Sequence, residues 1–236
     1  MFLSVNIYMK KVLVNGGSYT TGLSPFELNW VNLLKKKVDI NITSIATPGV
    51  SIKQVVRTTI THLSQNGDYD AVIIIPPIGP SRREFILPTT SDQYDFTSIM
   101  VSNIKNINTF DTTKKALMKF YESKISNEWE DYMDILYNLH YLLMFLETLP
   151  IPYYVISDEH IVHQNPLNNS TQDDRTDSVY ENIKAFEQEI NKYIDINNSF
   201  IKIIGKQNID NYFHPTYKGY DMFADFIIEN FLNKEI

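Results

Sequence analysis

Two short segments, one near each end of the chain, carry residue types that together could hydrolyse an ester. Gly16 to Gly22 reads G-G-S-Y-T-T-G, and Ser18 at its centre could act as a nucleophile. A serine in a glycine-rich turn between a strand and a helix can point its hydroxyl into a crevice while its own backbone N–H faces a developing oxyanion. His214, which precedes Pro215, could take the proton of that hydroxyl as a general base.

Each segment also has a plain structural interpretation. By itself, the 16–22 segment is more typical of an ordinary turn than of a nucleophile, and a histidine before proline is more often a structural loop residue than a catalyst. A phosphate-binding loop is disfavoured because neither G-x-G-x-x-G nor a G-K-[ST] ending is present, so we expect no cofactor. The chemistry therefore depends on whether the fold brings the two segments together.

The spacing of apolar residues predicts strands that alternate with helices along the chain. Strands are expected at residues 11–14, 42–46, 71–75, 153–156 and 200–204. Helices are expected at residues 24–34, 52–63, 132–150, 183–194 and 220–231, the first of them opening at Ser24-Pro25. This alternation predicts one α/β domain over residues 1–236, a three-layer α/β/α sandwich with about five parallel strands in flavodoxin-like order. Ligands bind at the carboxyl ends of such strands, and Ser18 and His214 both follow predicted strands.

The order of these segments resembles the conserved blocks of the SGNH (GDSL-like) hydrolases over nearly the whole chain. The first block of that family, G-D-S-L-x-x-G, is similar to residues 16–22, with glycine in place of Asp and tyrosine in place of Leu. The second block carries a glycine after the second strand, where Gly49 stands, and the third, G-x-N-D, is similar to residues 79–82. The last block, D-x-x-H-P followed by a glycine and a helix, is similar to residues 211–215.

The resemblance implies acyl transfer to water. Ser18 would attack the ester carbonyl, His214 would take and return the proton, and the backbone N–H groups of Ser18 and Gly49 would hold the oxyanion. The third donor of the family is an asparagine, where this chain has Ser81 with Arg82 beside it. Loss of one such donor typically lowers the rate by about 10²–10³-fold. The resemblance therefore assigns Ser81 and Arg82 to substrate or oxyanion binding.

The residue that supports the histidine also differs from the family pattern. Asn211 stands three residues before His214, where the family has Asp, and Asp210 lies one residue earlier. An amide can hold the imidazole ring but cannot stabilise its cation as a carboxylate does. We predict that Asp210 supports His214, although the spacing favours Asn211. A Ser-His dyad and a weakened or inactive enzyme are the alternatives.

Two stretches, residues 81–110 and residues 157–177, interrupt the alternation of strands and helices. Both follow the carboxyl ends of predicted strands, so they are interpreted either as loops that shape a substrate pocket or as ordinary surface insertions. A metal pair at His160 and His163 with Asp158 or Glu159 is less favoured, because no larger cluster of ligands is evident. We therefore expect no metal.

The composition limits the remaining classes of function. Contents of 43% hydrophobic and 21% charged residues suit a globular domain, and a net charge of −7 without a long basic run argues against a nucleic-acid partner. The chain has no cysteine, which excludes disulfides. No signal peptide and no apolar stretch of about 20 residues is evident, so we expect a cytoplasmic protein without a membrane partner, a setting that includes a phage-encoded product.

Taken with the resemblance, these features predict a serine hydrolase that acts on small-molecule or carbohydrate esters, of the esterase or O-deacetylase type. The main alternative is a catalytically silent binding domain that keeps the same fold. An unrelated flavodoxin-like nucleotide-binding domain is less favoured. The sequence leaves the oligomeric state open.

Overall fold

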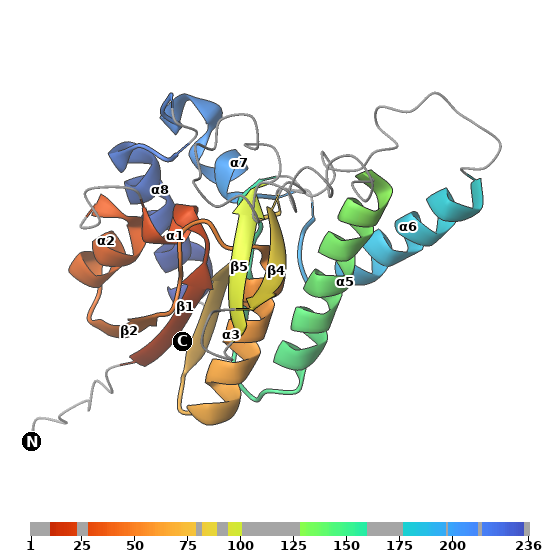
Figure 1. Cartoon of the computed structure of the whole chain (residues 1–236). Helices are drawn as coiled ribbons and strands as arrows, with labels where there is room; N and C mark the ends of the chain where they lie inside the picture. The colour runs from red at the N-terminus through yellow and green to blue at the C-terminus, as the bar shows by residue number, and fades with distance from the viewer. Residues whose placement is uncertain are drawn as a thin grey trace, which may run out of the picture.

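The structure of the chain is a computed structural model that describes residues 10–22, 28–78, 82–88, 94–100, 128–159, 177–196, 198–211 and 214–233. For residues 82–88, 94–100, 128–130 and 177–180 it describes the backbone alone. The described residues form an α/β structure in which a parallel sheet lies between two layers of helices (Figure 1). The predicted fold class, a three-layer α/β/α sandwich, is confirmed.

A parallel sheet of four described strands, in the order β2-β1-β3-β6, forms the centre of the molecule. Its strands are β1 (Lys10–Gly16), β2 (Ile40–Ser44), β3 (Ala71–Ile75) and β6 (Tyr153–Val155). β1 and β3 are neighbouring parallel strands, as predicted, with Val12 beside Ala71 and Val14 beside Ile73. Every residue of β3 is buried, because helices cover both faces of the sheet, and this explains the absence of polar alternation in that strand.

Alternating side chains along the strands divide the core into two halves. Leu13, Val72 and Ile74 pack on one face against α3 (Ile52–Gln65), α5 (Glu128–Glu147) and α6 (Asp177–Ile190). Val12, Val14 and Ile73 pack on the other face against α2 (Trp30–Lys37), α7 (Phe200–Ile204) and α8 (Tyr217–Ile227). A π-helical segment, η6 (Ile228–Leu232), continues α8. Two short elements, α1 (Ser18–Thr21) and η5 (Lys206–Asn208), complete the described helices.

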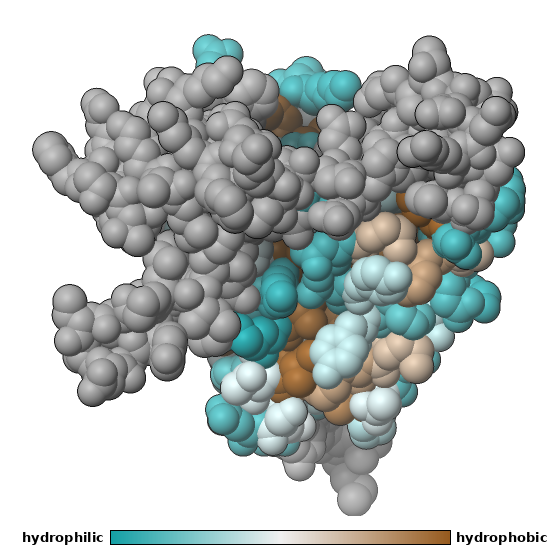
Figure 2. Space-filling view, turned by 45° about the vertical axis from the view of Figure 1, so that its right-hand side comes forward, coloured by the Kyte–Doolittle hydropathy of each residue, from teal (hydrophilic) through white to brown (hydrophobic). Residues whose placement is uncertain are grey.

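The outer face of α5 carries large side chains at the surface. Tyr137, Tyr141 and Met144 are exposed and recur at helical spacing, so they lie along one side of the helix. Figure 2 brings this side of the molecule forward, where hydrophobic (brown) and intermediate (pale) residues lie together among hydrophilic (teal) ones. Within the described residues, no helix is both long and apolar enough to span a bilayer.

The predicted fifth strand at residues 200–204 is wrong, because this segment is the helix α7. Its β-branched composition suggests a strand, but the residues on either side are helix signals. The Ser199 side chain caps the helix by accepting a hydrogen bond from the Lys202 backbone N–H at 3.2 Å. Gly205 ends it with a φ of 78°. β6 is therefore the last described strand on its side of the sheet.

The first insertion, predicted as a loop over residues 81–110, contains a β-hairpin. β4 (Arg82–Pro88) and β5 (Tyr94–Met100) pair antiparallel, with Arg82 opposite Met100. The sequence signal was a run of turn-forming residues between two segments rich in aromatic and β-branched residues. Most of the second insertion, predicted over residues 157–177, lies outside the described residues, and α6 begins at its end.

The boundaries of two predicted elements are also corrected. The predicted start at Ser24-Pro25 lies outside the described residues. The helix α2 begins later than predicted, at Trp30. The Asn29 side chain caps it there by accepting a hydrogen bond from the Asn32 backbone N–H at 2.9 Å. α2 then continues past the predicted end at Leu34. The helix predicted through residue 194 ends at Ile190.

Candidate functional site

The carboxyl end of β1 is held in place by a buried asparagine. The amide nitrogen of Asn15 donates to the Val55 carbonyl at 3.1 Å, to the Thr58 hydroxyl at 3.0 Å and to the Thr59 hydroxyl at 2.8 Å, all in α3. Its side-chain oxygen accepts the Gly16 backbone N–H at 2.8 Å. No local pattern in the sequence marks this role of Asn15, which fixes the end of the strand just before Ser18.

Ser18 is the first residue of the short helix α1 and is 6% exposed. Gly17 precedes the helix, and its carbonyl accepts the backbone N–H groups of Thr20 and Thr21 at 3.0 and 3.2 Å. The first N–H groups of a helix have no acceptor within the helix, and the Ser18 N–H is one of them. The local fold therefore gives Ser18 both a hydroxyl and an N–H at the carboxyl edge of the sheet.

The segment that carries Gly49 lies along the same edge. The Ile45 N–H donates to the Val14 carbonyl at 2.9 Å, and the Thr47 N–H donates to the Gly16 carbonyl at 3.1 Å. Gly49 is exposed, has a φ of 76°, and has no atom within 4 Å of the position that a Cβ would take. The positive φ explains the glycine, and its backbone lies open in a segment that pairs with the turn before Ser18.

The loop with His214 is closed by hydrogen bonds. The Asp210 N–H donates to the His214 carbonyl at 2.7 Å, and the Asp210 carboxylate accepts the His214 backbone N–H at 2.9 Å. Ile209 and Pro215 form a β-bridge next to this pair. Asp210 therefore lies close to His214, and its carboxylate contacts the backbone N–H of that residue.

The His214 ring is half-buried and lies against the residue that follows Ser18. The rings of His214 and Tyr19 contact each other edge-on, with 6.0 Å between their centroids. The fold thus brings the loop of His214 beside the turn of Ser18, although they are at opposite ends of the sequence. No hydrogen bond joins the Ser18 hydroxyl to the His214 ring in this structure, and catalytic hydrogen bonds are often loose before a substrate binds.

Aromatic packing behind the site joins these two segments to the core. Phe200 of α7 contacts Tyr19 at a centroid distance of 5.5 Å and Tyr220 at 6.3 Å, and it stacks on Phe223 at 4.0 Å. The helix α7, which replaces the predicted strand, thereby supplies the ring on which the Ser18 turn and α8 both pack. Sequence reasoning missed Tyr19 and Phe200 as site-supporting residues, because their contact joins distant segments.

Tyr220 lies close to both parts of the site. It is 5% exposed, and among the described residues its hydroxyl has no hydrogen-bond partner. That hydroxyl lies 3.7 Å from the position that a Cβ on Gly22, at the end of α1, would take. Burial raises the pKa of the Tyr220 hydroxyl, and the charge of Asp210 raises it further. Tyr220 is therefore neutral at physiological pH and lies between the Ser18 helix and the Asp210 loop.

The remaining predicted site residues are placed only in part. Ser81 lies outside the described residues, and Arg82 is the first residue of β4, with its backbone alone described. Asn211 is exposed in the turn between Asp210 and His214.

For the weak metal hypothesis, His160 and His163 lie outside the described residues. The Asp158 carboxylate accepts the Ile78 N–H at 3.0 Å and the Glu159 N–H at 2.9 Å, so it connects the ends of β3 and β6. Among the described side chains there is no cluster of three potential metal ligands.

Several solved structures have the same fold. The psychrotrophic esterase EstA from Pseudoalteromonas sp. is 15% identical, the alignment covers 95% of this chain and 100% of that one, and the TM-score is 0.50. A protein of Desulfitobacterium hafniense assigned to the lipolytic G-D-S-L family is 11% identical, with coverage of 93% and 98% and a TM-score of 0.52. TesA is 11% identical, with coverage of 93% and 97% and a TM-score of 0.51. No protein-family model matches the chain, and no curated protein matches it in sequence. The chain has the fold of the SGNH-type hydrolases. The resemblance seen in the sequence is therefore confirmed for the fold.

Proposed function

We propose that the protein is an ester hydrolase of the SGNH type that uses Ser18 as its nucleophile. The observation that supports the proposal is the contact between the His214 and Tyr19 rings, because a candidate base that contacts Tyr19 is next to the turn of a candidate nucleophile. Both lie at the carboxyl edge of a parallel sheet, where folds of this class bind ligands. The overall fold also supports the proposal of an ester hydrolase.

In the proposed reaction, the Ser18 hydroxyl attacks the ester carbonyl while His214 takes its proton. The N–H groups of Ser18 and Gly49 donate to the oxyanion of the tetrahedral intermediate. His214 then gives the proton to the leaving alkoxide, which departs as the alcohol. A water molecule, activated in the same way, hydrolyses the acyl-enzyme and releases the acid. Ser81 or Arg82 would supply a third donor in place of the asparagine of the family.

The proposed substrates are small carboxylic esters, including O-acetylated carbohydrates. The alternative is a binding domain that keeps the pocket without the chemistry. Two substitutions favour that alternative, because Ser81 stands where the family has an oxyanion asparagine and Asn211 where it has the aspartate. The two functions differ in whether Ser18 reacts with an electrophile.

Covalent labelling distinguishes the hydrolase from the binding domain. Incubation with a fluorophosphonate probe, followed by proteolysis and mass spectrometry, is expected to place the phosphonate on Ser18. Ser18→Ala should abolish the label, whereas Ser44→Ala, an exposed serine at the end of β2, should leave it unchanged. Absence of labelling, or a label that survives in Ser18→Ala, would favour the binding domain.

A further prediction concerns the charge near His214. Asp210→Asn keeps an oxygen that can accept the His214 N–H but removes the charge, so the loop should stay closed. We expect kcat to fall by orders of magnitude, up to the roughly 10⁴-fold seen for the comparable serine-protease change, because the imidazolium loses its counter-charge. Asn211→Asp should change kcat little. Steady-state kinetics on p-nitrophenyl acetate measure both, and a gain of activity in Asn211→Asp would show that Asp210 is a structural residue.

A further inference from the structure

Asn15 occupies a core position that an apolar side chain would fill. It is 1% exposed, follows Leu13 on the same face of β1, and lies beside Ile74 of β3. A buried amide is stable at such a position only when its polar atoms are paired, as they are here. The nitrogen donates to three acceptors in α3, and the oxygen accepts the Gly16 N–H. The amide therefore connects α3 directly to the turn that carries Ser18.

The segment that carries Gly49 is connected to the same amide at both of its ends. Before Gly49, the Thr47 N–H donates to the Gly16 carbonyl at 3.1 Å. After it, Ser51 caps α3, and the Ser51 carbonyl accepts the Val55 N–H at 3.1 Å. The Val55 carbonyl in turn accepts a hydrogen bond from the buried amide, also at 3.1 Å. The two residues at the end of β1 therefore hold the backbone on either side of Gly49.

We propose that Asn15 is a positioning residue whose side chain sets the spacing between the Ser18 and Gly49 N–H groups. The inference rests on the proposed function, in which these two groups hold the oxyanion. Both donors must lie about 3 Å from the same oxygen, so a small change in their separation weakens both hydrogen bonds. Asn15 acts on this spacing through Gly16 on one side and through α3 on the other.

Loss of this link should lower the rate of the reaction more than the binding of the substrate. The carbonyl oxygen of the ester becomes an anion only during the attack, so misplaced donors raise the barriers of acylation and deacylation alike. Removal of a complete donor lowers the rate about 10²–10³-fold, and a displaced donor should have a smaller effect. We expect Asn15→Ala to lower kcat for p-nitrophenyl acetate at least about tenfold and to leave KM within about twofold.

Thr59→Val is the milder variant, because it keeps the shape of the side chain and removes one acceptor of the Asn15 amide. It should lower kcat about threefold. The double variant Asn15→Ala/Thr59→Val should be no slower than Asn15→Ala alone, since both changes act through one link. Thr61→Val makes the same change at an exposed position of α3 and should have no effect.

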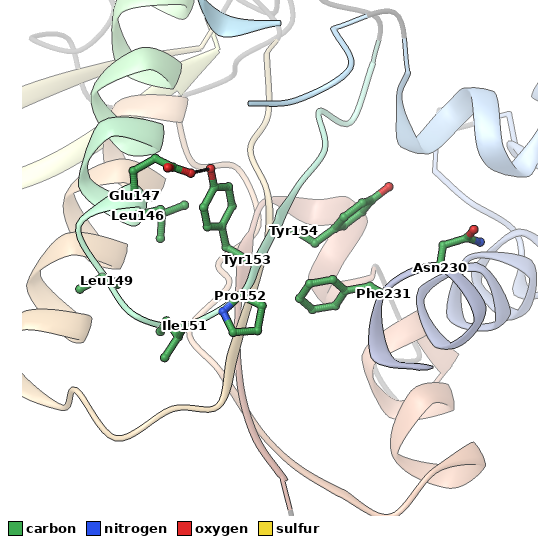
Figure 3. Close-up of a pocket in the computed structure, with 9 residues that line it drawn as sticks. All are labelled: Leu146, Glu147, Leu149, Ile151, Pro152, Tyr153, Tyr154, Asn230 and Phe231. Carbon is green, nitrogen blue, oxygen red and sulfur yellow. Dashed lines mark hydrogen bonds between the residues drawn. The ribbon is translucent and has the colours of Figure 1, made fainter. Parts of the chain in front are cut away.

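A second control removes a hydrogen bond beside the cavity of about 400 Å³ that is drawn in Figure 3. There the Tyr153 hydroxyl of β6 donates to Glu147 at the end of α5, and β3 lies between β6 and β1. Tyr153→Phe should leave kcat unchanged. It therefore distinguishes a positioning role of Asn15 from a general effect of losing one hydrogen bond at the sheet.

Hydrogen exchange tests the link independently of the reaction. The Thr47 amide should exchange at least about threefold faster in Asn15→Ala than in the natural protein, because the Gly16 carbonyl that it bonds is no longer held. Neither control should change this rate. If Asn15→Ala does not fold, the comparison of Thr59→Val with Thr61→Val gives the same readouts.

Three results would overturn the proposal: unchanged kcat in Asn15→Ala, unchanged exchange at Thr47, or an equal fall of kcat in Tyr153→Phe. If the natural protein takes no fluorophosphonate label at Ser18, the proposed function fails, and the oxyanion role of Asn15 fails with it. A natural protein that is labelled while Asn15→Ala keeps its kcat leaves the proposed function standing and removes only the role of Asn15.

Discussion

Replacing Ser18 with alanine is expected to lower kcat/KM for p-nitrophenyl acetate by at least about 10⁴-fold, because the nucleophile is lost and the remaining oxyanion donors accelerate the reaction only modestly. Folding should not change. Ser18 is 6% exposed, and alanine differs from it by one oxygen that makes no hydrogen bond among the described residues. Steady-state kinetics give the rate, and a thermal melt of the same sample gives the stability.

The matched control is Ser44→Ala, which should keep the rate of the natural protein. A residual rate in Ser18→Ala close to that of the natural protein would remove Ser18 from the reaction, whatever the labelling shows. His214→Ala should lower the rate by a similar factor, and the double variant should be little worse than either single variant. This non-additivity is expected because a nucleophile and its base act as one unit.

Gly16→Ala should lower the free energy of unfolding by about 3 kcal/mol, the upper part of the usual range for overpacking a core. An added Cβ would lie 2.3 Å from the Thr20 hydroxyl and 2.5 Å from the Ile75 carbonyl oxygen. The Ile75 oxygen belongs to the backbone of the buried strand β3, so it cannot move aside without disturbing the sheet. Urea denaturation followed by circular dichroism measures the change.

Gly67→Ala is the control for this substitution. An added Cβ there would meet only the Leu63 carbonyl, at an ordinary 3.5 Å, so the free energy of unfolding should change by less than about 0.5 kcal/mol. Equal stability of Gly16→Ala and Gly67→Ala would mean that β1 and β3 are not as close at this point as the structure shows. Because Gly16 is two residues before Ser18, we expect Gly16→Ala also to lower ester hydrolysis.

The sequence by itself was sufficient for the part of the fold that depends on local periodicity. The run from Ala71 to Ile75 identified a strand covered on both faces, and helical spacing identified α3, α5 and α8. The alternation of these elements implied a parallel sheet, and the right-handed connection of parallel strands restricts the order in which they pair. The pairing of β1 with β3 followed from the flavodoxin-like strand order expected for such a sheet. The family resemblance then singled out the segments of Ser18, Gly49 and His214.

Only the tertiary structure decided what joins those segments. Residues 200–204 form a helix because Ser199 and Gly205 supply its ends and because Phe200 packs between Tyr19 and Phe223, a contact that no local pattern encodes. The contact of His214 with Tyr19 likewise depends on how α8 and α7 pack on the sheet. The periodicity of the sequence shows which face of a helix or strand is apolar. The element that packs against this face is determined by shape and volume over the whole core. The elements could therefore be predicted from the sequence, and their side-chain contacts could not.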